Sequence, residues 1–501
     1  MKKHKNFSRR QFINTAAAGS LGFTLVPRHV LGGKGYVPPS DKLNLAYIGC
    51  GTQGLREMCP LIQQTDVQIT AVCDPNKMST NYLDWSPFGI RNDIRKVLDD
   101  KNWGENYKGI PGGRDVGQEL VDKYYGKVKN MPNYKGCRSY EDFRELLEKE
   151  TNIDAVKIMT PDHLHAYISI AAMKKGKHVV IHKPIANRMH EARLTIETAR
   201  KTGVSTHLLA WSKRSGIDLA VKWLRAGHIG NLKAIHNWSF RPVWPQFNVV
   251  PADKPAIPEG FNWDLWLGVV PDRPYHPNYT HNVFRGWYDF GGGSIADMGH
   301  YSLWPLFIAL GITSPASSAE ARGTTHSVAV DGVCRRQPNT AAFPYSSMIN
   351  FKFAAQAGLP TFSLHWYDGG MKPPTPEELG DKELAAEGMM LVGDKGFILG
   401  DFRGEKPRLY PDKLMKSVMG DAKYEEETES GDRHWIEPFK NKKESPGSFL
   451  LASPITETIQ LGALALRAGK RVVYDSSTMK ITNDEAANKL LFREYRKGWE
   501  L

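Results

Sequence analysis

The sequence predicts an α/β domain with a parallel sheet, followed by an α+β domain with a large open sheet that is mixed or antiparallel. Three observations support this prediction. The chain has 501 residues, which is long for a single domain. A glycine-rich turn near residue 50 joins a strand pattern to a helix pattern, and strand and helix patterns then alternate, as in parallel sheets covered on both faces. We expect the first domain to span residues 41–205 and the second to span 206–501.

The first element is a buried strand, Leu43–Ile48, which leads directly into Gly49-Cys50-Gly51-Thr52-Gln53-Gly54 and then into helical character over Leu55–Gln63. Between a strand and a helix, this glycine spacing is typical of a Rossmann dinucleotide-binding turn. The glycines allow the backbone to approach a pyrophosphate at a helix N-terminus. We therefore expect contacts to a dinucleotide from Gly49, Gly51, Thr52, Gln53 and Gly54.

The second strand, Val67–Cys73, ends at Asp74, which lies 20 residues after Gly54. An acidic residue at this place accepts hydrogen bonds from the ribose hydroxyls of the cofactor. Its negative charge also repels a 2′-phosphate. The sequence therefore predicts NAD as the cofactor in preference to NADP.

Strand and helix patterns continue through the rest of the first domain. We expect a helix over Tyr140–Lys149 behind Ser139, a strand over Asp154–Met159, a helix over His163–Lys175 and a strand over Lys177–Ile181. Residues 83–115 are rich in Asp, Asn, Gly and Lys and break the alternation, so we interpret them as a surface insertion. In the second half we expect strands near Ala234–Phe240, Ser347–Phe353 and Thr361–Trp366, and helices over Thr456–Ala468 and Asn483–Arg496.

Two segments in the first domain resemble motifs of the glucose–fructose oxidoreductase, inositol dehydrogenase and MocA (Gfo/Idh/MocA) family. They are Thr160-Pro161-Asp162-His163-Leu164-His165-Ala166, similar to T-P-x-x-x-H-A, and Gly176-Lys177-His178-Val179-Val180-Ile181-His182-Lys183-Pro184, similar to G-K-H-V-x-x-E-K-P. The resemblance implies that Thr160, Pro161 and His165 line the nicotinamide side of the site and that Lys183 reaches the substrate hydroxyl. The chain departs from the family at His182, where the family has glutamate.

Further family landmarks lie at residues 263–268, 284–287, 291–300, 393–396 and 493–499, so the resemblance runs from about residue 43 onward. Asp297 and His300 are three residues apart at the predicted start of a helix, whereas family members commonly show a spacing of four. Three residues still allow both side chains to face one site.

The family resemblance implies hydride transfer between a ring carbon of a sugar or glycoside and the nicotinamide. We expect Lys183, Asp297 and His300 to be the catalytic residues. His300 would be the general base because imidazole titrates near neutral pH, Lys183 would stabilise the developing alkoxide, and Asp297 would orient the hydroxyl. Two alternatives stay open. One is an NAD-dependent glycosidase that uses transient oxidation and elimination, and the other is an inactive nucleotide-binding sensor or scaffold.

The formal net charge of +12 does not indicate a nucleic-acid partner. Seven basic residues and no acid lie in residues 1–34, and the rest of the chain has no long Lys/Arg run. Within that first segment, Ser8-Arg9-Arg10-Gln11-Phe12-Ile13 resembles the twin-arginine export motif. We therefore expect residues 1–34 to be an export signal read by the twin-arginine machinery, with the enzyme in the periplasm and an uncleaved anchor as an open alternative.

The five cysteines form neither a C-x-x-C pair nor a metal-ligand spacing, so we expect most of them to be small buried side chains and expect no metal. No run of 18 uncharged apolar residues indicates a transmembrane helix. In the resembling family the open face of the second sheet often forms a dimer interface, which implies a homo-oligomer.

Overall fold

The computed structural model describes residues 41–131, 134–420 and 424–501. The predicted export segment, residues 1–34 with its paired Arg9 and Arg10, lies outside the described residues. No helix in the described ranges has both the length and the apolar character needed to cross a bilayer. Four of the five cysteines are buried, as expected, and Cys334 is exposed.

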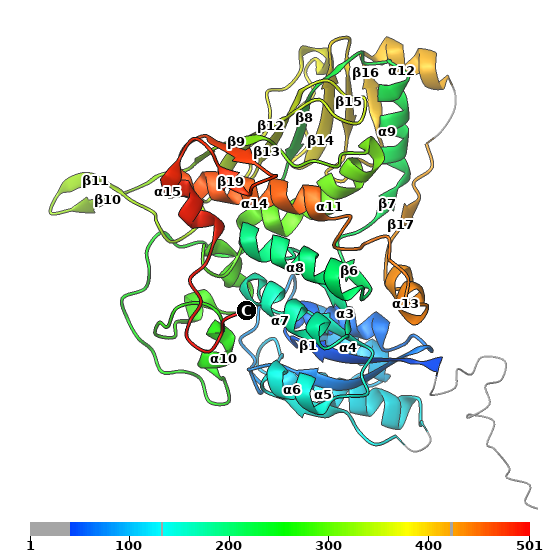
Figure 1. The fold of residues 1–501 in the computed structure, drawn as a ribbon, viewed down its shortest axis with the longest axis vertical. Helices are drawn as coiled ribbons and strands as arrows, with labels where there is room; N and C mark the ends of the chain where they lie inside the picture. The colour runs from blue at the N-terminus through cyan, green and yellow to red at the C-terminus, as the bar shows by residue number, and fades with distance from the viewer. Residues whose placement is uncertain (1–40, 132–133, 421–423) are drawn as a thin grey trace, which may run out of the picture. The chain divides into compact units, whose positions relative to one another are not determined.

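A parallel sheet of six strands in the order β3-β2-β1-β4-β5-β6 forms the core of the first domain (Figure 1). Its side chains alternate between two apolar layers: Leu45 and Tyr47 pack on one face, and Ala46 and Ile48 on the other. This confirms the predicted Rossmann sheet. The strands are β1 (Leu43–Ile48), β2 (Val67–Cys73), β3 (Arg138–Tyr140), β4 (Ala155–Ile158), β5 (His178–Ile181) and β6 (Thr206–Leu208).

Helices cover both faces of this sheet. One face carries α3 (Thr52–Leu61), α4 (Gly89–Leu98), α5 (Arg114–Lys123) with its π-helical extension η2 (Tyr124–Val128), and the late helix α13 (Arg433–Lys440). The other face carries α6 (Phe143–Lys149), α7 (Asp162–Lys174) and α8 (Met189–Thr202). Because α13 comes from the second half of the sequence, the chain returns to complete the first domain.

Three details of the first domain differ from the predictions. The segment 83–115 is not only a surface insertion, because it contains α4, whose Ile90 and Ile94 are buried in the core. Tyr140 belongs to strand β3, and α6 begins only after Asp142, whose side chain accepts a hydrogen bond from Arg144 N at 2.8 Å. The sheet also extends past the predicted boundary at residue 205, since β6 pairs with β5.

The second domain contains a sheet of nine strands in the order β16-β15-β14-β8-β13-β12-β9-β18-β19. Strands β8 and β13 are parallel and the other neighbours are antiparallel, which confirms the predicted mixed sheet. The strands are β8 (Leu232–Trp238), β9 (Ser318–Gly323), β12 (Ser347–Phe353), β13 (Phe362–Tyr367), β14 (Gly388–Gly393), β15 (Phe397–Gly400), β16 (Arg408–Tyr410), β18 (Val472–Asp475) and β19 (Lys480–Ile481). The hairpin β10 (His326–Val330)–β11 (Val333–Gln337) and the pair β7 (Lys213–Arg214)–β17 (Thr428–Glu429) are separate from this sheet.

Long apolar helices lie between the second sheet and the first domain (Figure 1). These are α11 (Gly293–Leu310) and α14 (Ser453–Ala468). The remaining helices are α9 (Ser215–Arg225), α10 (Trp263–Leu267), α12 (Asp412–Met419), α15 (Glu485–Asn488) and the 3-10 turns η3 (Pro277–Tyr279), η4 (His281–Gly286), η5 (Glu377–Leu379) and η6 (Lys489–Leu491).

The prediction of one helix over Asn483–Arg496 is wrong, because helical structure in this segment is limited to α15 and η6. From Phe492 onward the chain is non-helical. Arg493 instead makes long-range hydrogen bonds: its Nε donates to Glu191 Oε1 of the first domain at 2.8 Å, and its Nη1 donates to the carbonyl of Asp289 at 3.0 Å. These buried long-range bonds outweigh the local preference for a helix.

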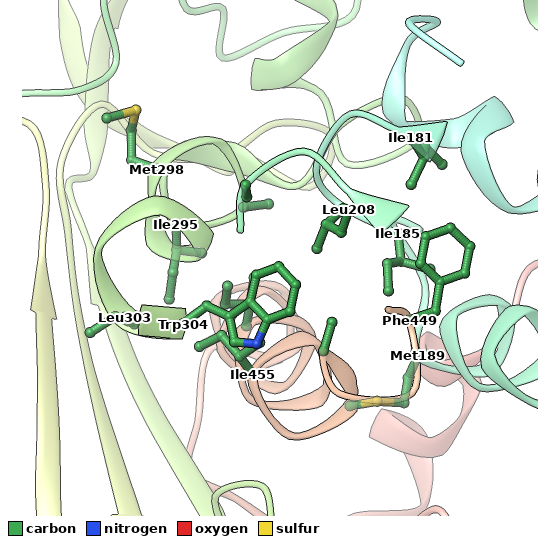
Figure 2. Close-up of a cluster of buried hydrophobic side chains, with 14 of the residues drawn as sticks. Ile181, Ile185, Met189, Leu208, Ile295, Met298, Leu303, Trp304, Phe449 and Ile455 are labelled. Carbon is green, nitrogen blue, oxygen red and sulfur yellow. The ribbon is translucent and has the colours of Figure 1, made fainter. Parts of the chain in front are cut away.

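One apolar cluster joins the two domains (Figure 2). Figure 2 shows Ile181, Ile185 and Met189 of the first domain on one side of the cluster, and Ile295 and Trp304 of α11 with Ile455 of α14 on the other. Closely packed interiors resist displacement. The loop after β5 is therefore held in a fixed position against α11, and this contact positions the candidate site.

Candidate active site

The turn after β1 requires glycine at its first position. Gly49 has φ +100°, and a Cβ there would lie 2.6 Å from the backbone C and O of Met159 at the end of β4. A Cβ at Gly54 would collide with the carbonyl oxygen of Gly49. The turn thus packs directly on the neighbouring strand, and helix α3 packs directly on the turn.

The N-terminus of α3 faces a cavity with its amide groups uncapped. Gly51 at the N-cap offers no side-chain acceptor, and the first turn holds no acidic residue. Thr52, Gln53 and Gly54 line the cavity. Free N–H groups and the positive end of the helix dipole make this point suitable for a phosphate group.

Asp74 connects the end of β2 to the glycine turn. Its Oδ2 accepts a hydrogen bond from Cys50 N at 2.7 Å, and its Oδ1 accepts one from Asn76 N at 2.8 Å. Burial raises the pKa of Asp74 to about 6, and the two backbone donors oppose that rise. Each carboxylate oxygen can accept more than one hydrogen bond, so Asp74, which also lines the cavity, is able to receive ribose hydroxyls.

A single cavity of about 420 Å³ lies between the glycine turn and the second domain. Its walls come from the ends of β1, β2, β4 and β5, from the segment 82–85, and from these second-domain residues: Arg241, Val243, Trp244, Pro245, His281, Asn282, Phe284, Arg285, Asp297, Met298, Tyr301 and Arg403. Of the predicted site residues, the structure places in this wall Gly49, Gly51, Thr52, Gln53, Gly54, Asp74, Thr160, Pro161, Lys183 and Asp297. His165 and His300 are not in it.

The charged centre of the cavity is a buried triad. Lys183 Nζ donates to Asp297 Oδ1, and Arg285 Nε lies 3.2 Å from the same oxygen. Burial lowers the pKa of Lys183, although Asp297 opposes that change. Burial also disfavours the charge of Asp297, but Lys183 and Arg285 outweigh it and hold the pKa of Asp297 below its usual value. The carboxylate is therefore ionised beside two cations.

His165 lies behind the cavity wall rather than in it. Its ring nitrogens are 2.6 Å from the carbonyl oxygen of Pro184 and 2.8 Å from that of Thr160. Burial lowers its pKa to about 4, so the ring is neutral near neutral pH. A neutral imidazole has one N–H, so it donates to one of these two carbonyls and only contacts the other. The expectation that it lines the nicotinamide side does not match its position.

The expectation that His300 is the general base also conflicts with the geometry. The side chain is fully buried, and neither ring nitrogen has a hydrogen-bond partner among the described residues. Burial lowers its pKa to about 3. Because a base must come within hydrogen-bond reach of the proton it removes, His300 is badly placed for that role.

Tyr301 lines the cavity, although it was not among the site residues predicted from the sequence. It lies four residues after Asp297, which is the spacing common in the resembling family, and both side chains line the cavity on one face of α11. Lys183 Nζ lies 5.4 Å from the centre of the Tyr301 ring. The family spacing, counted from Asp297, would have identified this residue.

His182, which stands where the family has glutamate, is in direct contact with Tyr301. The hydroxyl of Tyr301 lies 2.9 Å from Nε2 of His182. Burial lowers the pKa of His182 far below its usual value, and Lys183 and Arg285 add to this effect, so the imidazole is neutral and can accept a hydrogen bond from the hydroxyl. The histidine at the place of the family glutamate therefore has a defined partner.

Sequence reasoning also missed several cavity residues with side chains that carry charge or large rings. They are Asp84, Trp85, Arg241, Trp244, Arg285 and Arg403. Arg285 lies in one of the family landmarks, which could have identified it. The others come from segments with no motif, and only the folded chain brings them to the cavity.

Two family models match the chain in succession. The model GFO_IDH_MocA, described as the oxidoreductase family with an NAD-binding Rossmann fold, matches residues 115–209. The model GFO_IDH_MocA_C2, described as the C-terminal α/β domain of the oxidoreductase family, matches residues 223–337. The order of the two matches is the order of the two observed domains.

Levoglucosan dehydrogenase of Pseudarthrobacter phenanthrenivorans is 32% identical over 114 residues, which cover 21% of this chain and 29% of that protein. A glycosyl hydrolase family 109 protein of Shewanella pealeana is 26% identical over 209 residues, 39% of this chain and 37% of that protein. The alignments thus span about a third of the length of these relatives. The structure of the WlbA dehydrogenase from Bordetella pertussis in complex with NADH and UDP-GlcNAcA covers 87% of this chain and 99% of its own, with a TM-score of 0.50 and 14% identity, a likeness of fold.

Proposed function

We propose that this chain, which carries both domains of the Gfo/Idh/MocA oxidoreductase family, transfers hydride between a ring hydroxyl carbon of a sugar or glycoside and bound NAD. One observation carries the proposal. One cavity is lined both by the glycine turn and Asp74 and by Lys183, Asp297 and Tyr301. A dinucleotide and a hydroxylated substrate could therefore meet within it.

The residues present fit NAD. The uncapped start of α3 would hold the pyrophosphate, Asp74 the ribose hydroxyls, and Thr160 and Pro161 the nicotinamide side. When bound, NAD supplies the acceptor for the hydride. An ionised Asp74 would repel a 2′-phosphate, which favours NAD over NADP.

Tyr301 is the proposed proton-transfer group. As the ring C–H bond gives up its hydride, the substrate hydroxyl would lose its proton to the oxygen of Tyr301 while Tyr301 releases its own proton to water in the cavity, and the hydrogen bond to Nε2 of His182 holds the Tyr301 hydroxyl in place. No free phenolate is needed, which matters because burial raises the pKa of Tyr301. Lys183 stabilises the negative charge that develops on the substrate oxygen, and Asp297 keeps Lys183 charged and oriented.

A second candidate is the glycosidase cycle, which the partial match to a glycosyl hydrolase family 109 protein favours. There the oxidation is transient: a ketone acidifies the neighbouring ring C–H, the aglycone leaves, water adds, and the hydride returns to the sugar. The same cavity would serve both reactions, since both begin with oxidation of a ring hydroxyl.

The test uses the purified full chain with bound NAD and a panel of sugars and aryl glycosides. A lasting rise in reduced-nicotinamide absorbance means net dehydrogenation. Release of the aglycone without a lasting rise means the glycosidase cycle. If neither signal occurs with any sugar, the oxidoreductase proposal fails and a nucleotide-binding sensor is left.

We also propose that residues 1–34 direct export through the twin-arginine route to the periplasm. The support is the Ser8–Ile13 motif within a basic segment that has no acid. Replacing Arg9 and Arg10 with Lys should leave the folded protein in the cytoplasm. Unchanged periplasmic yield of the double variant would refute this proposal.

A further inference from the structure

The cavity wall around Asp297 and Tyr301 carries an excess of positive charge. Four cationic side chains and one carboxylate line it; they are Lys183, Arg241, Arg285 and Arg403, with Asp297 as the acid. They come from the loop after β5, the segment after β8, the turn η4 and the loop after β15. Because distant parts of the sequence supply them, the excess is a property of the folded cavity.

Asp297 cannot balance this charge. One of its oxygens already contacts both Lys183 and Arg285. Arg241 and Arg403 have no carboxylate oxygen within 4.0 Å among the described residues. Positive charge inside a partly enclosed cavity is unfavourable without a counter-charge. A negatively charged ligand would supply one.

Arg241 shows the lack of a partner most clearly. Its guanidinium group lies 4.9 Å from the ring centre of Trp85 and 5.5 Å from that of Phe240, so two aromatic rings position it. Its Nε and Nη1 are buried and have no hydrogen-bond partner among the described residues. A guanidinium group only donates hydrogen bonds, so a matching ligand must present acceptors. A carboxylate or a sulfate ester supplies such acceptors.

The phosphates of NAD do not meet this requirement. The glycine turn and the uncapped start of α3 offer them a site of their own. The cation nearest to that turn in sequence, Arg56, is already paired with Asp84. The glycine turn thus gives the cofactor's phosphates hydrogen-bond donors of its own, so the two unpaired arginines are not needed to hold them.

From this charge distribution we propose that the substrate is an acidic sugar or glycoside, whose carboxylate or sulfate ester binds Arg241 with support from Arg403. The inference rests on the proposed function, because it assigns the substrate class of that same cavity. It also gives Arg241 the role of a specificity residue, which holds the acidic group while a ring hydroxyl lies at Lys183 and Tyr301.

The test compares glucose, glucuronate and glucose 6-sulfate, and their aryl glycosides, with the full chain holding NAD. We expect kcat/KM for at least one acidic sugar to exceed that for glucose by about tenfold or more. Whichever acidic sugar is preferred identifies carboxylate or sulfate as the bound group. Arg241→Gln should lower the ratio of acidic to neutral kcat/KM by about 10- to 100-fold. Arg408→Gln, an exposed arginine of β16 that pairs with Asp412 at 3.4 Å, is the matched control and should leave the ratio unchanged.

Two results would overturn the inference. One is equal or better turnover of neutral sugars by the unmodified chain. The other is an Arg241→Gln variant that binds NAD more weakly but keeps the acidic-to-neutral ratio, since Arg241 would then serve the cofactor. If no sugar reduces the bound cofactor, the proposed function fails, and this failure is distinct from failure of the inference about acidic sugars. Calorimetry with glucuronate, glucose 6-sulfate and glucose then decides the inference: tighter binding of an acidic sugar supports it, and equal or absent binding of the acidic sugars refutes it.

Discussion

Tyr301→Phe tests the proposed proton transfer with the smallest possible change. The substitution removes one hydroxyl and keeps the ring that packs beside Lys183. The lost group makes one hydrogen bond, to His182 at 2.9 Å, so the free energy of unfolding should fall by only about 0.5–1.5 kcal/mol. A positioned acid–base group contributes about 10²- to 10⁴-fold to the rate. At about 1.36 kcal/mol per tenfold, the activation barrier should rise by about 3–5 kcal/mol.

The assay measures kcat and KM with the best substrate of the panel, and NAD affinity by fluorescence titration. We expect kcat to fall by at least about 100-fold, while KM and NAD affinity change little, because the hydroxyl acts mainly in the transition state. His300→Leu is the comparison variant, since His300 lies outside the cavity. If His300→Leu loses turnover and Tyr301→Phe keeps more than half of it, the reasoning is refuted and the histidine is the base after all.

Three further predictions concern other parts of the cavity. Lys183→Met should lower kcat by about 10²- to 10³-fold because the developing alkoxide loses its cation, whereas Lys175→Met at the exposed end of α7 should not change it. NAD affinity, titrated from pH 5 to 8, should rise as pH passes about 6, because ionised Asp74 accepts stronger hydrogen bonds from the ribose, and Asp74→Asn should bind weakly at every pH. Gly49→Ala should lose NAD binding, and its melting temperature should be well below that of Gly176→Ala. Gly176 also has a positive φ, but a Cβ added there has no neighbour within 4 Å.

Each of these predictions has a result that contradicts it. Turnover by Lys183→Met equal to that of Lys175→Met would remove the lysine from the mechanism. A flat NAD titration between pH 5 and 8 would mean that the charge of Asp74 does not contribute to binding. Equal melting temperatures for the two alanine variants would show that the close approach of Gly49 to the backbone of Met159 does not lower the stability of Gly49→Ala. The shared positive φ alone is expected to cost about 1–2 kcal/mol in both.

Local sequence patterns predicted much of the first domain. Strands β1 and β2 begin and end at the predicted residues, because short apolar runs bounded by turn residues specify buried strands locally. The glycine spacing predicted the turn, and the placement of Lys183 after β5 followed from the strand that precedes it. These features depend on residues close together in the sequence, so periodicity and turn chemistry are sufficient to find them.

The tertiary structure decided what depends on distant contacts. The i+4 spacing from Asp297 allowed Tyr301 to face the cavity, but the packing of α11 against both domains buried His300 and opened Tyr301 toward His182. Long-range bonds of Arg493 likewise ended the last predicted helix early. Arg241 and Trp85 meet only after the chain has folded, because they lie far apart in sequence. The sequence by itself therefore determined the fold class and the place of the cofactor turn, whereas side-chain direction and the charge of the cavity were set by packing between segments that no local pattern connects.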